Sequence, residues 1–236
     1  MLHPRTERRL HIPGRRKSRL VVTLALACVS ILLAACSSGP QGDATASQVG
    51  GPAQTSATYP GALLFPRAYP KPDVTLTDTS ETPYNIAADT SHRITLVYFG
   101  YTHCPDLCPL NMATAAAAIR ELPKSDRSRV TMVFVTTDPD RDTPSVIRTW
   151  LDHFDSNFIG LDGSIEQIRQ AEARTGIPLS FAEHSSQPGA SYAVVHAGYV
   201  LVYTQDNHSH LEFPAEISVA QESHDLATLL QHGWQR

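Results

Sequence analysis

Residues 94–109 read Ile-Thr-Leu-Val-Tyr-Phe-Gly-Tyr-Thr-His-Cys-Pro-Asp-Leu-Cys-Pro, an apolar run that leads directly into two closely spaced cysteines. The segment Ile94–Phe99 is apolar or β-branched without polar alternation, which is typical of a strand covered on both faces. Gly100 ends this run, and an alanine-rich helical segment follows the second cysteine. Because proline is tolerated only in the first turn of a helix, that helix is expected to begin between Pro105 and Pro109. Both thiols are therefore expected at the carboxyl end of a central strand, where open α/β sheets place their sites.

The rest of the chain alternates between strand and helix patterns. A second apolar strand over Val130–Val135 completes a right-handed parallel βαβ unit with the first strand and the helix between them. With the two-thiol turn at the first strand–helix junction, this order predicts an α/β, thioredoxin-like fold with a central mixed sheet flanked by helices and an N-terminal hairpin. The other expected elements are a hairpin from residues 76–78 and 84–86, a helix opened by Thr143 and Pro144, a strand over 159–161, a helix from Ser164 to Gly176, an exposed loop over 182–190, strands over 192–195 and 199–203, and a closing helix over 223–232.

The first 36 residues have the pattern of an export signal. Seven Lys and Arg residues precede an apolar segment, Leu20–Ala35, which is short for a membrane span but suits a signal-peptide core. The segment ends in Leu33-Ala-Ala-Cys36, which resembles a bacterial lipobox, although an uncleaved signal anchor is the alternative. We therefore expect a signal peptide with lipobox over 1–36, a flexible tether over 37–60 and one domain over 61–236, lipid-anchored through Cys36 at the extracytoplasmic face of the cell membrane.

Removal of this leader changes the charge and the thiol inventory. Of nineteen basic and twenty-three acidic residues, seven and one precede Cys36, so twelve basic and twenty-two acidic residues remain, a net charge of −10. Such a surface should repel nucleic acid and anionic lipid headgroups. Cys28 leaves with the signal and Cys36 takes the lipid. Cys104 and Cys108 are then the remaining thiols, with no structural disulfide competing for them.

The spacing of Cys104 and Cys108 permits two chemistries. Residues four apart on a helical turn face the same side, so the pair can hold one soft metal ion or cycle between dithiol and disulfide. A helix N-terminus favours the thiolate that both chemistries need. Thioredoxin-type redox turns have two intervening residues, and the three found here widen the spacing. We therefore expect chelation rather than rapid disulfide exchange.

A metal site needs a third ligand, and histidine is the obvious source. His196 ends an apolar run just before another strand, at a junction that lies opposite the two-thiol turn in thioredoxin-like architecture. It is the candidate to complete a Cys₂His site suited to Cu(I) and tolerant of Cu(II); a strand-end histidine bonded to backbone is the alternative. His103 is expected to tune the thiolate charge or to pack against the site. His208 and His210 are either an auxiliary copper contact or part of a solvated hairpin turn.

Two longer motifs make the pattern specific. Phe99-Gly-Tyr-Thr-His-Cys-Pro-Asp-Leu-Cys-Pro109 is followed by Thr137-Asp-Pro-Asp-Arg-Asp-Thr-Pro144, then by Phe158-Ile-Gly-Leu161 and His196. From about Leu64 to the C-terminus the chain resembles the Sco/SenC family, whose members are membrane-tethered, thioredoxin-fold copper proteins that assist assembly of the copper site of cytochrome c oxidase.

The resemblance implies copper as cargo, with Cys104, Cys108 and His196 as its ligands. It implies that Asp138 supports the site or the docking of a partner, although an N-cap or turn role is equally open. The implied partners are the copper-site subunit of cytochrome c oxidase and another copper carrier or a thioredoxin-like reductant. The sequence departs from the family pattern at Val195, where an acid is usual, and at 205–210, where the usual Asp-Gly hairpin turn is absent. These changes leave the thiol pair intact and affect the tuning of the site and, to a lesser degree, the surface that meets a partner.

Two functions fit these residues. The first is an extracytoplasmic copper metallochaperone, which is a binding protein rather than an enzyme. The alternative is a thiol–disulfide reductase that keeps the oxidase copper-site cysteines reduced. His196 separates the two, because copper retention needs it and disulfide exchange largely does not. A peroxiredoxin-like peroxidase would need an arginine and a Thr or Ser supporting Cys104, and the sequence offers no such set near it. A structural zinc site would need a fourth protein ligand, and none is apparent.

Overall fold

The computed structural model describes residues 54–184 and 191–235. The predicted signal, the lipobox with Cys36 and the tether up to residue 53 lie outside the described residues. Among the residues that are described, no helix has the length and apolar character needed to cross a membrane.

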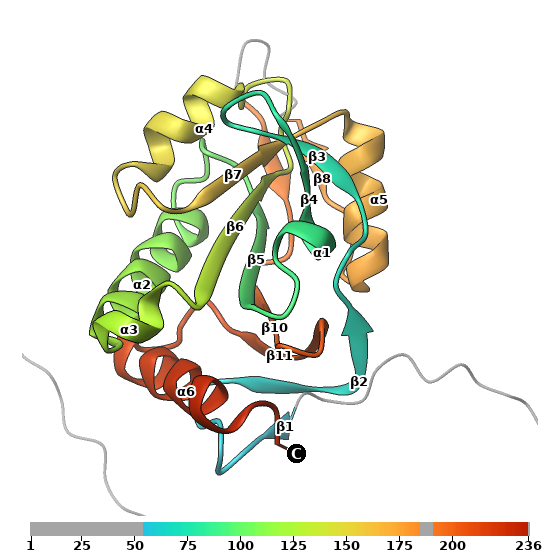
Figure 1. Ribbon diagram of the computed structural model, residues 1–236. Coiled ribbons are helices and arrows are strands. Elements are labelled where there is room, and N and C mark those ends of the chain that lie inside the picture. The colour runs from blue at the N-terminus through green and yellow to red at the C-terminus, as the bar shows by residue number, and fades with distance from the viewer. Residues whose placement is uncertain (1–53, 185–190, 236) are drawn as a thin grey trace, which may run out of the picture. The chain divides into compact units, whose positions relative to one another are not determined.

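The described strands form one mixed nine-stranded sheet and one small ribbon (Figure 1). In the large sheet the order is β1-β2-β11-β10-β5-β6-β7-β3-β4, with β5, β6 and β7 parallel and every other pair antiparallel. The bounds are β1 Gln54–Thr55, β2 Leu63–Pro70, β3 Thr75–Asp78, β4 Pro83–Asn85, β5 Ile94–Gly100, β6 Val130–Thr136, β7 Ile159–Asp162, β10 Val200–Tyr203 and β11 His208–Phe213. The mixed α/β fold with its N-terminal hairpin, β3–β4, is therefore confirmed.

Helices cover both faces of this sheet because β5 is apolar on both sides. Its seven residues are all buried: Ile94, Leu96 and Tyr98 face one core, and Val97 and Phe99 face the other. α2, α4 and α6 pack on the first face, and α1 and α5 on the second (Figure 1). The helix bounds are α1 Ile86–Asp89, α2 Leu107–Glu121, α3 Lys124–Arg127, α4 Pro144–Leu151, α5 Ile165–Thr175 and α6 Val219–His232.

Local capping chemistry sets the helix ends as the sequence predicted. The Thr143 side chain caps α4, Ser164 and Gln167 form a capping box on α5, and Gly176 ends α5 in the left-handed conformation. α6 begins at Val219 rather than at residue 223, because Ser218 and Gln221 form a second capping box.

Two expectations about the C-terminal half are wrong. Residues 208–213 form strand β11 between β2 and β10, so His208 and His210 do not lie on a turn. The expected loop over 182–190 begins instead with a strand, β8 (Phe181–Glu183), and 185–190 lie outside the described residues. The strand expected over 192–195 is confirmed as β9 (Ala193–Val195), which pairs with β8 in a separate ribbon and not with the main sheet.

The packed domain also reaches further toward the N-terminus than residue 61. Tyr59 has no exposed surface, and its ring stacks on Trp234 at a centroid distance of 5.3 Å. Its hydroxyl donates a hydrogen bond to the carbonyl of Gly233 at 3.2 Å. The last residues assigned to the tether therefore hold the C-terminal end of α6 in place.

Candidate metal centre

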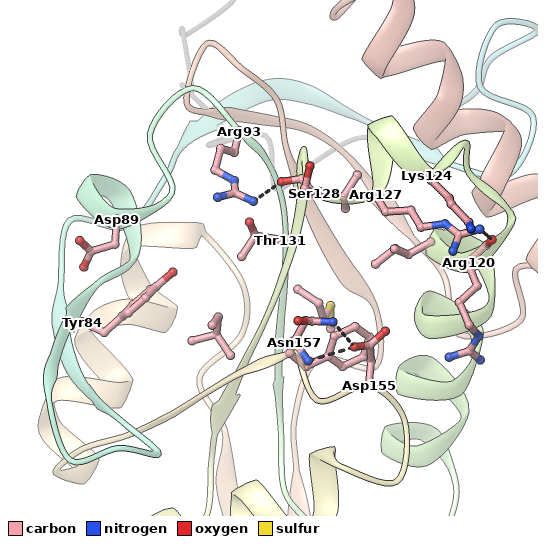
Figure 2. Close-up of a pocket in the computed structure, with 15 residues that line it drawn as sticks. Tyr84, Asp89, Arg93, Arg120, Lys124, Arg127, Ser128, Thr131, Asp155 and Asn157 are labelled. Atoms are coloured by element: carbon pink, nitrogen blue, oxygen red, sulfur yellow. Dashed lines mark hydrogen bonds between the residues drawn. The ribbon is translucent and has the colours of Figure 1, made fainter.

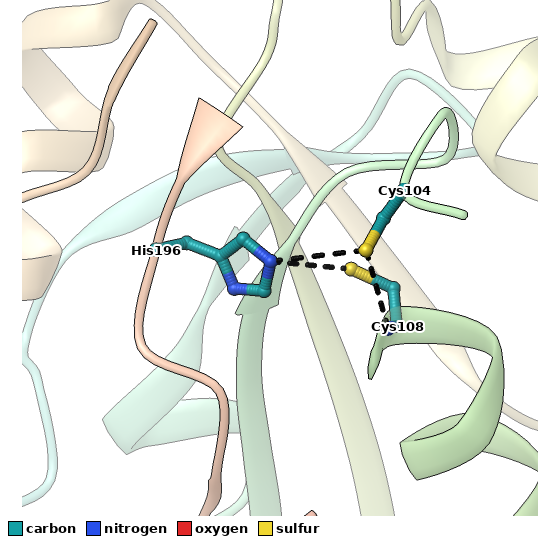
Figure 3. Close-up of side chains that lie close together, drawn as sticks. All are labelled: Cys104, Cys108 and His196. Carbon is teal, nitrogen blue, oxygen red and sulfur yellow. Dashed lines mark hydrogen bonds between the residues drawn. The ribbon is translucent and has the colours of Figure 1, made fainter. Parts of the chain in front are cut away.

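The site lies at the carboxyl end of β5, beside the start of the neighbouring strand β10. Cys104 lies in the loop between β5 and α2, and Cys108 is the second residue of α2. His196 follows β9 and precedes β10, whose Leu201 pairs antiparallel with Val97 of β5. The start of β10 therefore lies beside the end of β5, which places the imidazole opposite the two thiols (Figure 3).

The three donor atoms are spaced as a single metal ion requires. His196 Nε2 lies 3.6 Å from Cys108 Sγ and 4.0 Å from Cys104 Sγ, and all three ligand atoms lie within 4.8 Å of one another. Metal–sulfur bonds of about 2.3 Å and metal–nitrogen bonds of about 2.0 Å, at trigonal angles, put sulfur and nitrogen about 3.7 Å apart. Two soft sulfurs and one imidazole in this arrangement fit a three-coordinate copper ion.

The orientation of His196 is set by backbone and by aromatic rings. Nδ1 donates to the carbonyl of Ala197 at 3.0 Å, so Nε2 carries the lone pair and faces the sulfurs. Tyr98 and Tyr101 meet the imidazole edge-on at centroid distances of 5.8 and 5.6 Å. Val195, which stands where an acid is usual in the family, is exposed, and the Ala197 carbonyl orients the imidazole instead.

The two thiols have opposite electrostatic environments. A hydrogen bond from the Cys108 thiol, helped by the backbone N–H groups of Cys108 and Asp106, lowers the pKa of Cys104 to about 4 against the opposing effect of burial. Burial, together with the Cys104 sulfur, raises the pKa of Cys108. Cys104, which is partly exposed, is therefore the thiolate of the pair, and the buried Cys108 remains a protonated thiol.

Cys108 is held by groups that the sequence did not single out. The Tyr98 hydroxyl donates to its sulfur at 3.6 Å, and Asn111 Nδ2 donates to the same hydroxyl at 3.4 Å and to the Leu107 carbonyl at 2.8 Å. A Cβ on Gly100 would lie 2.9 Å from Cys108 Sγ, so only glycine leaves room for the sulfur. The alternation of side chains along β5 puts Tyr98 on the face that α2 covers. This alternation was the sequence signal from which its contact with Cys108 could have been inferred.

Asp138 links the loop after β6 to the segment that carries His196. Its buried carboxylate accepts a hydrogen bond from the Tyr192 hydroxyl at 2.6 Å and from Arg141 Nε at 2.5 Å. The Arg141 guanidinium lies 3.7 Å from the centroid of the Tyr192 ring and donates to the Tyr192 carbonyl. This clasp fixes the chain four residues before His196, and sequence reasoning missed two of its three members.

His103 is mostly exposed and takes part in a hydrogen-bonded network. Its Nδ1 lies 3.2 Å from Thr102 Oγ1 and 3.6 Å from Asp142 Oδ1. With Asp138 and Asp142 it forms a second group of possible metal ligands. The Asp142 carboxylate already accepts from Thr102 N at 2.9 Å and Thr136 Oγ1 at 2.8 Å, so it serves to hold the loop before Cys104.

The structure does not bring His208 and His210 to the thiols. They begin β11 just after Tyr203, which pairs with Thr95 near the start of β5, whereas Cys104 follows the end of β5. His210 Nε2 lies 2.8 Å from Asp206 Oδ2, and its ring stacks on Trp234 at 4.5 Å. The proposed auxiliary copper contact is therefore at the wrong end of the sheet.

Comparison with known proteins shows which family and which solved structures this chain is similar to. The family model described as SCO1/SenC matches residues 68–231. A protein of Stutzerimonas stutzeri described as copper-binding is 30% identical over 161 residues, which cover 67% of this chain and 77% of that protein. The solution structures of apo Sco1 from Thermus thermophilus align with a TM-score of 0.63 and 27% identity over 70% of this chain and 94% of that one. Bradyrhizobium japonicum ScoI with copper bound aligns with a TM-score of 0.58 and 25% identity over 65% and 95% of the two chains.

Proposed function

Because this chain belongs to the SCO1/SenC family, we propose that it is an extracytoplasmic copper metallochaperone that assists assembly of the copper site of cytochrome c oxidase. Cys104, Cys108 and His196 hold the ion. The observation that carries this proposal is the convergence of two sulfurs and one imidazole nitrogen, 3.6 and 4.0 Å apart, from two separate segments of the chain.

The donor set explains how the ion can be both kept and released. Two thiolates bind Cu(I) tightly, and the imidazole also suits Cu(II). Three ligands leave a coordination position for a donor from the acceptor protein. Because Cys104 is half-exposed and Cys108 is buried, an incoming cysteine reaches the ion from the Cys104 side. Transfer then proceeds by stepwise replacement of ligands, without oxidation or reduction of the protein.

Apolar side chains around the site support docking of an acceptor protein there. Leu107, Val195 and Phe181 are large hydrophobic residues with exposed side chains. Leu107 adjoins Cys108 in the chain, Val195 adjoins His196, and Phe181 pairs with Val195 across the β8–β9 ribbon. Exposed apolar residues grouped beside a functional site are typical of a protein-binding surface.

We also propose that the domain is anchored to the extracytoplasmic face of the cell membrane through lipid on Cys36. The lipobox-like Leu33-Ala-Ala-Cys36 and the basic, apolar leader support this assignment. The mass of the mature chain tests it: a diacylglyceryl group on an N-terminal Cys36 is expected, and an intact leader would contradict it.

A thiol–disulfide reductase is the second candidate, favoured by one specific observation. A half-exposed thiolate beside a buried thiol is the arrangement that a nucleophilic and a resolving cysteine need. Disulfide exchange makes no use of the Nε2 lone pair of His196, which faces both sulfurs. The chaperone is therefore the better-supported function.

Anaerobic copper titration of the reduced protein tests the proposal. We expect one Cu(I) per chain, lost in Cys104→Ala/Cys108→Ala and bound about tenfold or more weakly in His196→Ala, because one of three ligands is gone. His184→Ala is the matched control, since His184 lies in the segment after β8 and is not among the three donors. Equal copper binding with and without His196, combined with reduction of disulfides in an oxidase-derived peptide, would establish the reductase instead.

A further inference from the structure

The described part of the molecule has a second concave site, at the end of the sheet opposite the thiols. A cavity of about 570 Å³ lies where β5, β6 and β7 begin, between the α1 side of the domain and the α2–α3 corner (Figure 2). Nothing in the copper chemistry uses it.

Four cations line this cavity. Arg93 stands on one wall, and Arg120, Lys124 and Arg127 stand on the opposite wall (Figure 2). In the part of the chain that the structure describes, no carboxylate oxygen lies within 4.0 Å of any of the four. A group of unpaired cations is unexpected in a chain whose segment after Cys36 has a net charge of −10.

Two carboxylates also face the cavity, and both already have partners. Asp89 accepts a hydrogen bond from the backbone N–H of Asn85 at 2.7 Å. Asp155 accepts from the backbone and side-chain nitrogens of Asn157 at 2.9 and 2.8 Å. Four cations against two acids leave the lining with two excess positive charges.

The arginines are held in place by backbone rather than by acids. Arg93 donates to the carbonyl of Ser128, Arg120 donates to that of Phe154 at 3.2 Å, and Arg127 donates to that of Leu122 at 3.0 Å. Each guanidinium has five N–H donors, so several remain free for a ligand. Because these guanidinium groups are already anchored, they lose little side-chain conformational entropy when they bind an oxyanion.

Below the cations the cavity wall is apolar, with one unused hydroxyl. Thr131 Oγ1 is buried without a hydrogen-bond partner among the described residues, and Figure 2 places its side chain between the two basic walls. The volume is far larger than a bare phosphate ion needs. The apolar lining residues are Ile119, Val130, Met132, Phe158 and Ile159.

We propose that this cavity binds a small organic phosphate, either a free phosphate ester or the headgroup of a membrane lipid. The phosphate oxygens take the free donors of Lys124 and its neighbouring arginines on the α2–α3 wall, and the organic part covers the apolar wall. Arg and Lys side chains on one wall suit the several oxygens of a phosphate group, and Arg93 on the facing wall adds to the local positive charge. The overall negative charge of the chain opposes contact with anionic surfaces at long range, and this site reverses that charge locally.

Titration of the full chain with phenyl phosphate, in phosphatidylcholine nanodiscs, tests the free-ester source. Hydrogen exchange of residues 120–128, in nanodiscs with and without phosphatidylglycerol, tests the lipid source. The test variant is Arg120→Gln/Lys124→Gln. Its control, Arg67→Gln/Arg174→Gln, removes the same charge from exposed residues outside the cavity. Both variants should bind copper like the unchanged chain.

We expect one phenyl phosphate per chain, or slower exchange that depends on phosphatidylglycerol, and whichever probe responds identifies the source. The response should weaken about tenfold or more in the cavity variant and less than about twofold in the control. The proposal is overturned if neither probe gives a response, or if the two variants weaken the response equally, since the effect would then be that of net charge alone.

Discussion

The two ends of the central parallel strands use the same sheet in opposite ways. At the carboxyl end, Cys104, Cys108 and His196 are held by partly buried hydrogen bonds, close contacts and the Asp138 clasp. At the amino end, Arg93, Arg120 and Lys124 are exposed, and backbone carbonyls anchor the two arginines. The first end fixes three donor atoms close together, and the second presents exposed positive charge. Substitutions should therefore be costly at the first end and nearly neutral for stability at the second.

The largest contrast is expected between the two thiols of the first end. Because the pKa of Cys104 is lowered to about 4, its thiolate persists as the pH falls from 8 toward 5, whereas an ordinary thiol loses about tenfold of its thiolate per pH unit below its pKa. Iodoacetamide should modify Cys104 at a nearly constant rate over that range and leave Cys108 unmodified, as read by peptide mass spectrometry. A tenfold fall in the Cys104 rate per pH unit would contradict this.

Removal of the Asp138 carboxylate should cost the most stability. Asp138→Ala leaves the mostly buried guanidinium of Arg141 unpaired, and we expect a loss of about 3 kcal/mol in the free energy of unfolding. Urea unfolding measures it. Asp152→Ala, which breaks the more exposed Arg148–Asp152 pair, is the control and should change stability by less than about 1 kcal/mol. Equal losses in the two variants would mean that the clasp is an ordinary surface contact.

Addition of a methyl group at Gly100 should cause the next largest loss of stability. In Gly100→Ala the new Cβ lies 2.9 Å from Cys108 Sγ and 2.5 Å from the Tyr98 ring, so the sulfur or the ring must move. We expect a loss of about 1–3 kcal/mol in stability and weaker Cu(I) binding by competition titration. Gly198→Ala meets only the tip of Leu107, at 3.0 Å, and serves as the control with little effect. Unchanged copper affinity in Gly100→Ala would show that the sulfur position is not fixed by this contact.

The smallest stability effect is expected at the amino end. Arg120→Gln/Lys124→Gln should change the free energy of unfolding by less than about 0.5 kcal/mol, because both side chains are exposed and neither pairs with an acid among the described residues. Thermal unfolding of the two proteins side by side measures the difference. A loss comparable to that of Asp138→Ala would mean that these cations are structural, and the contrast between the two ends would fail.

The sequence predicted the carboxyl end better than the amino end for a physical reason. Ile94–Phe99 and the proline-flanked cysteines are contiguous, so local pattern alone places both thiols at a strand–helix junction. His196 needed the additional assumption of thioredoxin-like architecture. Arg120, Lys124 and Arg127 lie within eight residues of one another, but only the folded sheet brings Arg93 and the apolar wall to them, so no local spacing could indicate the cavity.

Other features were missed because tertiary contacts decide them. Strand β11 alternates in burial, but two histidines at its start gave it the composition of a turn. Tyr59 is a single aromatic residue in a Ser- and Gly-rich stretch, and only its stacking on Trp234 shows that it belongs to the core. The bond from Tyr192 to Asp138 joins residues 54 positions apart. Spacing in the sequence carries no information about such a contact.

X-ray absorption spectroscopy of the anaerobically copper-loaded chain tests the central claim most directly, because it reports the ligands themselves. The account predicts two sulfur scatterers at about 2.3 Å and one nitrogen at about 2.0 Å around each copper, with the nitrogen lost in His196→Ala. A copper ion with sulfur ligands alone in the unchanged chain, or a spectrum that His196→Ala leaves as it was, would contradict the three-ligand site.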